Sequence, residues 1–359
     1  MGDMSAVTLL REAADELRWQ APGAAADLLR EGVRLLPADR AGSTDHWDLQ
    51  MRLARCLAVA GRLHHARYAA HQLLHQLPGD ERQRPTAVAL AAMIERLLGH
   101  HPQARALLLH ELDTLQDAAT ATSLKLELGL GALLAGDFSV DRLMIGEAYR
   151  TAHDLDHQPL RAHSAALVAL ADYTAGAITA AQSGAGYAAA VVDALPDQTL
   201  ATSLEATAYL GWTEMFLERF HPALRHFERG LRLARQTGQE HLFPYLLCGV
   251  ACDYYWLGQL DTAAQRADDA VAAAELSGSD ELRTMAYAMQ AFIACRKGDV
   301  DLGAAGRRTG GHRSRYHPRL VVRDGRRHLR GGPHARRRRS DRMRTRDRGC
   351  RWRSWVWRR

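Results

Sequence analysis

The sequence predicts an all-α superhelical solenoid of about eight antiparallel helical hairpins, followed by a basic tail. Three observations support this: a composition dominated by Ala and Leu, a turn that recurs about every forty residues, and a small residue at a fixed distance before each turn. Ala and Leu favour helix, whereas the aromatic residues that favour strands make up only 6% of the chain. A fixed period in this range is typical of a solenoid whose hairpins stack on their neighbours.

The recurring turn has the pattern Gly-x-apolar-x-x-Ala and lies between two helical segments. Its copies, several of them degenerate, start at Gln20, Gly61, Gly99, Gly136, Gly176, Glu218, Gly258 and Gly298. Successive starts are 41, 38, 37, 40, 42, 40 and 40 residues apart. Gly is expected there because a helix ends readily on a residue that tolerates the left-handed conformation. We therefore assign residues 1–303 to a helical repeat array whose eighth hairpin is incomplete.

The second regularity is a small residue seven positions before each turn start. The eight residues are Ala13, Ala54, Ala92, Gly129, Ala169, Gly211, Ala251 and Ala291. A side chain larger than methyl at such a position would hold the two helices of a hairpin apart. These positions are therefore predicted to lie where helices touch.

In the sixth repeat, Gly211 followed by Phe220, Ala223 and Phe227 resembles the spacing of tetratricopeptide repeats. The period near forty and segments such as 58–66 resemble the helical-repeat arm of the large ATP-binding transcriptional regulators of the LuxR type, common in actinobacteria. The resemblance covers about residues 5–303 and implies a protein-interaction or signal-sensing arm. In that family, a P-loop ATPase precedes the arm and a helix-turn-helix follows it.

The chain departs from this family in two respects. It contains no Gly-x-x-x-x-Gly-Lys-Ser/Thr loop, since neither of its two lysines, Lys125 and Lys297, follows a glycine loop of that kind. No recognisable helix-turn-helix follows the array. Catalytic patterns such as Gly-x-Ser-x-Gly and His-Glu-x-x-His are also missing. We therefore expect a truncated, non-enzymatic fragment without a cofactor, and ATP hydrolysis and sequence-specific DNA binding are not carried over.

Charge is distributed unevenly between the array and the tail. Residues 304–359 carry +18 and the whole chain carries +6, so the array carries −12 and is a poor electrostatic match for DNA. We expect the tail to be disordered. As a genuine C-terminus, it would bind nucleic acid non-specifically through phosphate contacts and base stacking. The residues expected to make these contacts are Arg336, Arg337, Arg338, Arg339, Trp352, Trp355 and Trp357.

We favour a second interpretation of the tail, in which residues 304–359 are a frameshift product. GC-rich coding DNA that is read in a wrong frame yields Arg, Gly, Pro, His and stray Trp, and the helical pattern stops abruptly after Gly303. This interpretation predicts that a neighbouring frame resumes the repeat and later encodes a helix-turn-helix. Translation of the downstream DNA in all three frames tests it.

Two pairs of residues have a spacing on a predicted helix that could hold a metal ion. His71 and His75 lie four positions apart on a predicted helix, but no carboxylate or Cys accompanies them at ligand spacing, so solvated surface histidines are favoured. Cys248 and Cys252 lie in a strongly apolar segment and are predicted to be buried small hydrophobic residues. No signal peptide is evident, and apolar runs such as 165–171 are too short to span a bilayer. We therefore expect no metal, no membrane partner and a cytoplasmic location.

Aromatic residues concentrate between positions 209 and 256. Most should be core, but three of them are consecutive and point in directions about 100° apart, so they cannot all face one core. The first helix of a tetratricopeptide hairpin usually lines the concave groove. We therefore predict a partner or ligand groove at Tyr209, Trp212, Tyr254, Tyr255 and Trp256.

The function favoured by the sequence is a protein-interaction or signal-sensing module of a LuxR-type regulator, with a protein as its partner. One alternative is a small-molecule inducer sensor with a groove near repeats six and seven. A second alternative is nucleic-acid binding through the tail. A compact pocket in repeats six and seven would favour the sensor.

Overall fold

The computed structural model describes residues 2–18, 20–79, 81–135 and 141–298, and within them every regular element is helical. Seven antiparallel hairpins follow one another: α1 (Met4–Leu17) with α2 (Pro22–Leu35), α3 (Thr44–Val59) with α4 (Leu63–Gln76), α5 (Arg84–Leu97) with α6 (His101–Leu112), α7 (Ala118–Ala135) with α8 (Asp141–Asp154), α9 (Gln158–Thr174) with α10 (Ile178–Ala194), α12 (Glu205–Phe216) with α13 (Phe220–Thr237), and α14 (Phe243–Trp256) with α15 (Leu260–Ser277). Helix α16 (Asp280–Lys297) opens the eighth hairpin. The short elements are α11 (Asp197–Leu200) and the 3-10 turns η1 (Ala38–Arg40), η2 (Ala201–Ser203) and η3 (Glu240–Leu242). The predicted tetratricopeptide-like, all-α solenoid is confirmed.

The turns inside the hairpins have the backbone conformation that the repeat pattern predicts. The residue at the turn start has a positive φ in each described copy from the second hairpin onward: Gly61 70°, Gly99 77°, Gly176 80°, Glu218 65°, Gly258 80° and Gly298 88°. Gly136 lies outside the described residues. Because φ values near 70° are costly for residues with a Cβ, glycine is the natural choice at these positions. Glu218 adopts the same conformation without being glycine.

The small residues before each turn lie at helix contacts. A Cβ added to Gly211 would stand 2.6 Å from the Phe227 ring of the following helix, and one added to Gly129 would collide with the Ile145 side chain. Ala54, Ala92, Ala169 and Ala251 are fully buried. Ala13 and Ala291, in the first and last hairpins, are partly exposed, because a terminal hairpin is covered by a neighbour on one side only.

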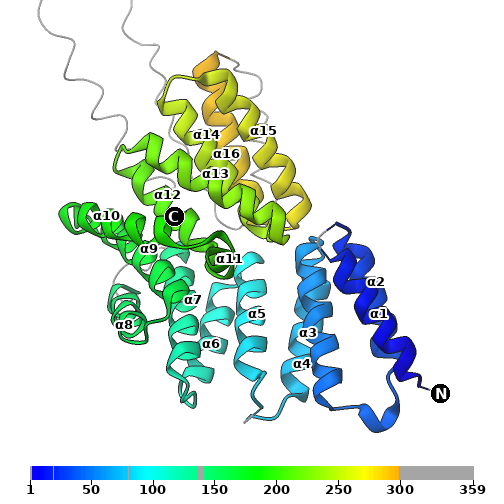
Figure 1. Cartoon of the computed structure of the whole chain (residues 1–359). Helices are drawn as coiled ribbons and strands as arrows, with labels where there is room; N and C mark the ends of the chain where they lie inside the picture. Colours follow the sequence, from blue (N-terminus) through cyan, green and yellow to red (C-terminus); the bar gives the residue numbers. More distant parts are fainter. Residues whose placement is uncertain (1, 19, 80, 136–140, 299–359) are drawn as a thin grey trace, which may run out of the picture.

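The array curls back on itself, so that its N-terminal part, at the second and third hairpins, meets its C-terminal end at α15 and α16. In Figure 1 it runs from α1 and α2 on the right, across α7 and α9 on the left, and returns over the top to α14–α16. Ser279, which is fully buried at the start of α16, donates a hydrogen bond from its Oγ to the Leu97 carbonyl at the end of α5, at 2.7 Å. Gly61 and Gly278 pack backbone to backbone, and a Cβ at either position would collide with the other chain segment.

The incomplete last hairpin and the tail fall partly beyond the described residues. Helix α16 coincides with the predicted first helix of the eighth hairpin. The start of its second helix and the whole tail, including Arg336–Arg339, Trp352, Trp355 and Trp357, lie outside the described residues. Among the helices that are described, none combines the length and apolar character needed to cross a membrane.

Candidate functional site

Polar side chains from five hairpins gather on the inside of the curled array. Their members, called here the interior cluster, are Arg96 (α5), Glu127 (α7), His163 (α9), Glu205 and Tyr209 (α12), His241 (η3) and Tyr245 (α14). Arg96 acts electrostatically on Tyr245 although their helices are four hairpins apart, because the curl brings the hairpins together. The first helix of each hairpin supplies most of these groups, so the inner face of the solenoid is strongly polar.

Arg96 and Glu127 form the centre of this cluster. The Arg96 Nε donates to Glu127 Oε1 at 2.7 Å, and Arg96 is only 7% exposed. Burial lowers the pKa of Arg96, but the Glu127 carboxylate and the surrounding groups outweigh this effect and raise the pKa above its usual value. The guanidinium therefore stays charged inside the protein. A buried ion pair adds little to stability because desolvation offsets its attraction, so its presence calls for another explanation.

The histidines and tyrosines of the cluster are held uncharged. Burial lowers the pKa of His163 to about 4 and also lowers the pKa of His241. Burial raises the pKa of Tyr245 to about 12 and that of Tyr209 well above its ordinary value. Near neutral pH, the cluster therefore offers neutral donors and acceptors around Arg96, with carboxylates on either side.

One imidazole nitrogen in the cluster has no hydrogen-bond partner among the described residues. His163 Nδ1 lies 3.2 Å from Ser203 Oγ, and its ring centroid lies 5.4 Å from that of Tyr209, but its buried Nε2 has no hydrogen-bond partner among the described residues. An unpaired buried polar atom costs free energy unless something else satisfies it. The inner face therefore has hydrogen-bonding capacity to spare.

The five aromatic residues predicted to form a groove lie in two different settings. Tyr209 belongs to the interior cluster and is 8% exposed. Trp212 is buried and packs against the rings of Phe216 and Phe227, with centroid distances of 5.7 Å to each. The three consecutive rings, Tyr254, Tyr255 and Trp256, are half-buried at the end of α14. The structure thus brings one of the five predicted residues into the interior cluster.

The three rings at the end of α14 make separate contacts, as expected for consecutive residues. The Tyr254 hydroxyl donates to Glu228 at 3.3 Å, and Tyr255 lies 4.6 Å from Phe292, centroid to centroid. Trp256 stacks on Phe220 at 6.2 Å. They bridge neighbouring hairpins, and whether they also contact a partner stays a prediction.

The sequence contained a signal for the interior cluster that the aromatic pattern did not reveal. His163, Glu205 and Tyr245 each stand thirteen residues before the turn start of their repeat. A polar or aromatic residue that recurs at one register of successive first helices lines one face of the array, because the hairpins repeat the same geometry. Arg96 and Glu127 occupy other registers, so pattern reasoning alone would have missed their pairing.

The histidine cluster near residue 71 differs from the prediction. His64, His65, His75 and His110 are exposed, as expected for solvated histidines. His71, however, contacts a carboxylate from the next hairpin: its Nε2 lies 2.6 Å from Glu95 Oε1. His100 Nδ1 lies 2.7 Å from Glu95 Oε2, and Arg67 also donates to this fully buried carboxylate. Sequence spacing could not reveal this contact because Glu95 comes from another hairpin.

These contacts are hydrogen bonds and an ion pair. Burial raises the pKa of Glu95, but hydrogen bonds from His100, His71 and Arg67 outweigh it and lower the pKa. Within the described residues, no three His, Cys, Asp or Glu side chains are placed to hold a metal ion. Cys248 and Cys252 are fully buried, and burial raises the pKa of Cys248 to about 12, so its thiol stays protonated. Both pack as small hydrophobic side chains, as predicted.

A second group of ionisable side chains lies between the packed helices of hairpins five to seven. This group, called here the enclosed network, consists of the buried Glu214 (α12), His226 (α13) and Asp253 (α14), with Asp193 (α10) exposed at its edge. His226 is fully buried, with Nδ1 at 2.6 Å from Glu214 and Nε2 at 3.2 Å from Asp193. Asp253 is also fully buried, and neither of its carboxylate oxygens has a hydrogen-bond partner among the described residues. Burial and the nearby Glu214 raise the pKa of Asp253 to about 9.

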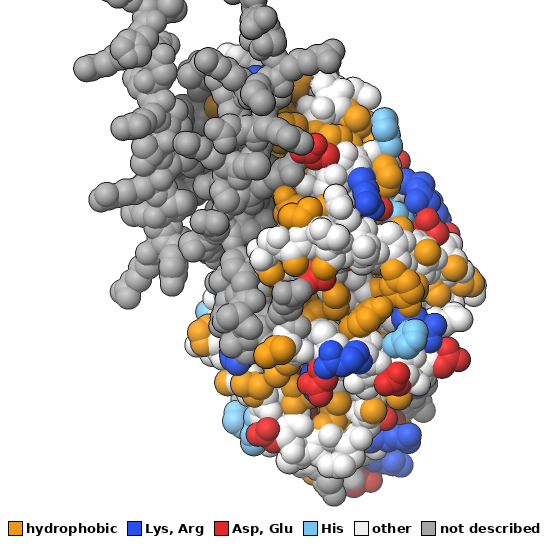
Figure 2. Space-filling view, turned by 90° about the vertical axis from the view of Figure 1, so that its left-hand side faces the viewer, with side chains coloured by type: hydrophobic (Ala, Val, Ile, Leu, Met, Phe, Trp, Pro, Cys, Tyr) orange, Lys and Arg blue, Asp and Glu red, His pale blue; other side chains and the backbone are white. Residues whose placement is uncertain are grey.

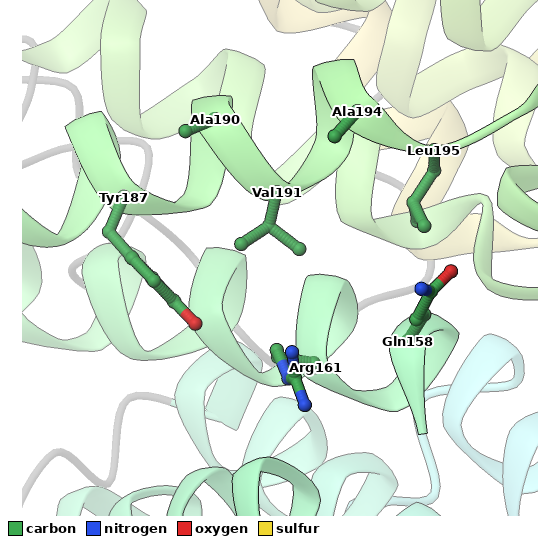
Figure 3. Close-up of a pocket in the computed structure, with 7 residues that line it drawn as sticks. All are labelled: Gln158, Arg161, Tyr187, Ala190, Val191, Ala194 and Leu195. Atoms are coloured by element: carbon green, nitrogen blue, oxygen red, sulfur yellow. The ribbon is translucent and has the colours of Figure 1, made fainter. Parts of the chain in front are cut away.

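The described surface has hollows between packed helices, and two of them are defined by their lining residues. The first, of about 350 Å³, lies between α9 and α10, and Figure 3 shows Tyr187 reaching from α10 toward Arg161 on α9. Figure 2 shows the side of the molecule that lies on the left in Figure 1, where hydrophobic side chains form several small groups rather than one large patch. Leu143, Ile178 and Tyr187 are the exposed large hydrophobic residues of α8 and α10. The second hollow, of about 390 Å³, lies where the two ends of the array meet.

Comparisons with known proteins return helical-repeat structures. No protein-family model matches the chain, and no curated protein matches its sequence. A Rap protein complexed with competence and sporulation factor is 12% identical, with a TM-score of 0.48 over 84% of this chain and 86% of that one. A signal-transduction ATPase with a tetratricopeptide repeat sensor, from Pyrococcus horikoshii, is 13% identical, with a TM-score of 0.46 over 82% of this chain and 46% of that one. TPR-like repeats of a Podosopora anserina protein described as a kinesin light chain are 17% identical, with a TM-score of 0.46 over 53% of this chain and 96% of that one. Likeness at this distance carries no argument about ligand or partner.

Proposed function

We propose that this chain is a non-enzymatic sensing or protein-interaction module that holds a segment of a partner protein against its interior cluster. The observation that carries the proposal is the Arg96–Glu127 pair, which is buried on the inner face beside a histidine nitrogen without a partner. Packing of a solenoid does not require such a pair, and buried ionisable groups with shifted pKa values are frequent at functional sites. Fold alone supplies no function, so the proposal depends on these residues.

The finer form of the proposal assigns the module to a cytoplasmic transcriptional regulator of the LuxR type. Its support is the sequence resemblance: the period near forty and the spacing of Gly211, Phe220, Ala223 and Phe227. In such a protein the repeat arm would receive a signal, and separate ATPase and helix-turn-helix parts would act on it. The small-molecule sensor is retained as the second candidate, because a hollow of about 390 Å³ is lined largely by residues of the sixth and seventh hairpins.

The test uses a photo-reactive phenylalanine analogue placed at Tyr245 of the full chain, in cells of the organism that carries the gene. A matched control places it at Tyr68, a residue of α4 that is 70% exposed. We expect one protein to cross-link to position 245 and not to position 68.

The captured protein supports the proposal only if it binds the purified full chain and if Arg96→Gln weakens that binding at least tenfold. Equal binding by wild type and Arg96→Gln would remove the interior cluster from the function. If positions 245 and 68 cross-link the same proteins, the inner face binds no specific partner and the proposal is wrong.

A further inference from the structure

The hollow at the junction of the two ends of the array, called here the seam pocket, has walls from hairpins far apart in the sequence. Ala58, Val59 and Leu97 come from α3 and α5, and Phe243, Leu247 and Leu282 come from α14 and α16. Helix α15 adds a stripe that includes Ala272, Ala273 and Leu276. Its volume of about 390 Å³ lies in the range of small-molecule sites. Residues from both sides of the junction therefore form the pocket.

The closing contacts lie directly beside this pocket. Leu97, whose side chain lines the pocket, accepts the hydrogen bond from Ser279 Oγ at 2.7 Å. The Gly61–Gly278 backbone contact follows Leu276 and Ser277, which also line it. His101 Nε2 and Glu281 Oε2, 3.3 Å apart, join the same two regions of the chain. A molecule in the pocket would contact both ends and favour the closed form, since binding stabilises the state that forms the site.

The pocket carries an imbalance of charge. Its polar lining consists of Arg235, Glu240, His241, Asp269 and Ser277. Asp269 is paired with Arg266 at 3.0 Å, whereas the half-buried Glu240 carboxylate has neither an ion pair nor a hydrogen bond from a described residue. Burial accordingly raises the pKa of Glu240 and lowers that of His241. Glu240 is thus a partly desolvated carboxylate that lacks a cation.

Arg235 does not supply that cation. Its guanidinium lies 5.8 Å from the centre of the Phe243 ring, and its side chain is exposed at the rim. An exposed guanidinium keeps its hydration and loses little without a partner, whereas a carboxylate that has lost water gains most from a new one. The array as a whole carries −12, which also attracts cations. The unpaired Glu240 carboxylate and the apolar walls of the pocket therefore both favour a cation with an apolar body.

We propose that the seam pocket binds a small organic ammonium ion with an apolar body, whose charged group pairs with Glu240 and whose body packs against Phe243, Leu247 and Leu282. The ligand would join the two ends of the array and hold it closed. This site deepens the proposed sensing function and rests on it for its purpose. Its test needs no partner protein, so failure of one proposal can be told from failure of the other.

The experiment measures binding of three probes of one shape to the purified full chain by calorimetry: 2-phenylethylammonium, 3-phenylpropionate and 2-phenylethanol. We expect saturable binding of the ammonium ion, about tenfold weaker binding of the alcohol, because it lacks the charge-assisted contact, and weaker binding still of the anion. Binding of the anion at least as tight as that of the ammonium ion would overturn the proposal. Absence of saturable binding by all three probes would also overturn it.

Two variants locate the site, and one controls for charge. Glu240→Gln should weaken binding of the ammonium ion about tenfold and leave binding of the alcohol unchanged. Glu12→Gln removes the same charge from an exposed position of α1 and should change the binding of neither probe. Ala273→Leu should weaken both by filling the pocket. Equal loss with Glu12→Gln would mean diffuse attraction to an acidic protein. Unchanged binding of the ammonium ion by Glu240→Gln would place that ion elsewhere and overturn the proposal. If a variant fails to fold, the ranking of the three probes on the wild-type chain still tests the proposal.

Discussion

The interior cluster and the enclosed network both bury ionisable side chains, but they do so in different ways. In the interior cluster, Arg96 is paired with Glu127 and the surrounding groups line the inner face of the curl. In the enclosed network, Asp253 is shut between packed helices with both oxygens unpaired, next to the Glu214–His226 contact. Most members of the interior cluster are half-buried, whereas Glu214, His226 and Asp253 of the enclosed network are fully buried and only Asp193 at its edge is exposed. Burial of ionisable groups alone therefore does not mark a functional site, and the two regions differ in how far their members are exposed.

The largest effect should come from breaking the enclosed network at His226. His226→Leu leaves Glu214, which is 2% exposed, without the imidazole at 2.6 Å. A buried carboxylate that loses its hydrogen-bond partner pays its full desolvation penalty, about 3 kcal/mol or more because the group is charged. Urea unfolding followed by circular dichroism should show a loss of this size.

His71→Leu is the matched comparison, because His71 makes a contact of the same length with Glu95, another fully buried carboxylate. Glu95 keeps Arg67 and His100 after this change, so the loss of stability should be clearly smaller. If the two variants lose equal stability, the enclosed network is no more sealed than the contacts at the surface.

An apolar contact in the same region provides a reference for packing without charge. Gly211→Leu places a side chain where even a Cβ would stand 2.6 Å from the Phe227 ring. Overpacking of this kind costs about 1–3 kcal/mol. Thermal melting should show a clear decrease for Gly211→Leu and a smaller one for Gly211→Ala, and an unchanged melting temperature in both would contradict the helix contact at Gly211.

Replacing Asp253 should stabilise the protein, which is the reverse of the His226 result. Its pKa of about 9 in the folded state lies above the value near 3.9 expected in the unfolded chain. The folded state therefore holds the proton more tightly, and the stability contributed by this group is present at low pH and lost as pH rises from about 4 toward 9.

Asp253→Asn removes this titration and the cost of the buried acid. At pH 8 we expect a gain of about 1–3 kcal/mol over wild type, and the gain should shrink toward pH 5. Unfolding measured at pH 5, 6.5 and 8 tests both statements. A gain that is the same at all three values would mean that Asp253 does not titrate in this range.

The sequence predicted local features well because each depends on a short segment. The positive φ of Gly61 follows from a helix end, and the contact of Gly211 with Phe227 follows from the hairpin register. The array closure could not be predicted, since Ser279 meets Leu97 only after the small rotations between many hairpins have accumulated. The interior cluster depends on that same curl, so the position of Arg96 in it could not be predicted, whereas Tyr209 was proposed from its aromatic character and stays a prediction as a binding residue.

The repeat pattern also did not predict the short elements that interrupt the series of hairpins. The segment from Asp197 to Ser203 adds α11 and η2 before the first helix of the sixth hairpin. Its trace in the sequence is the spacing of 42 residues between the turn starts at Gly176 and Glu218, the largest of the series. A spacing locates an insertion, but its conformation depends on packing against neighbouring hairpins.

The smallest effect on stability should come from the interior cluster, when both members of the central pair are replaced together. A double variant, Arg96→Met with Glu127→Leu, removes both charges while keeping apolar volume, so neither charge is left without its partner. Such replacements are often neutral or stabilising because the desolvation cost disappears with the charges. We expect the free energy of unfolding to change by less than about 1 kcal/mol.

Binding of the cross-linked partner to this double variant should nevertheless be lost, since the groups that receive it are gone. Arg96→Met alone should be clearly destabilising, because it leaves Glu127 unpaired. A double variant that unfolds as readily as the single one would mean that the pair holds the hairpins together, and the contrast between the two buried regions would then disappear.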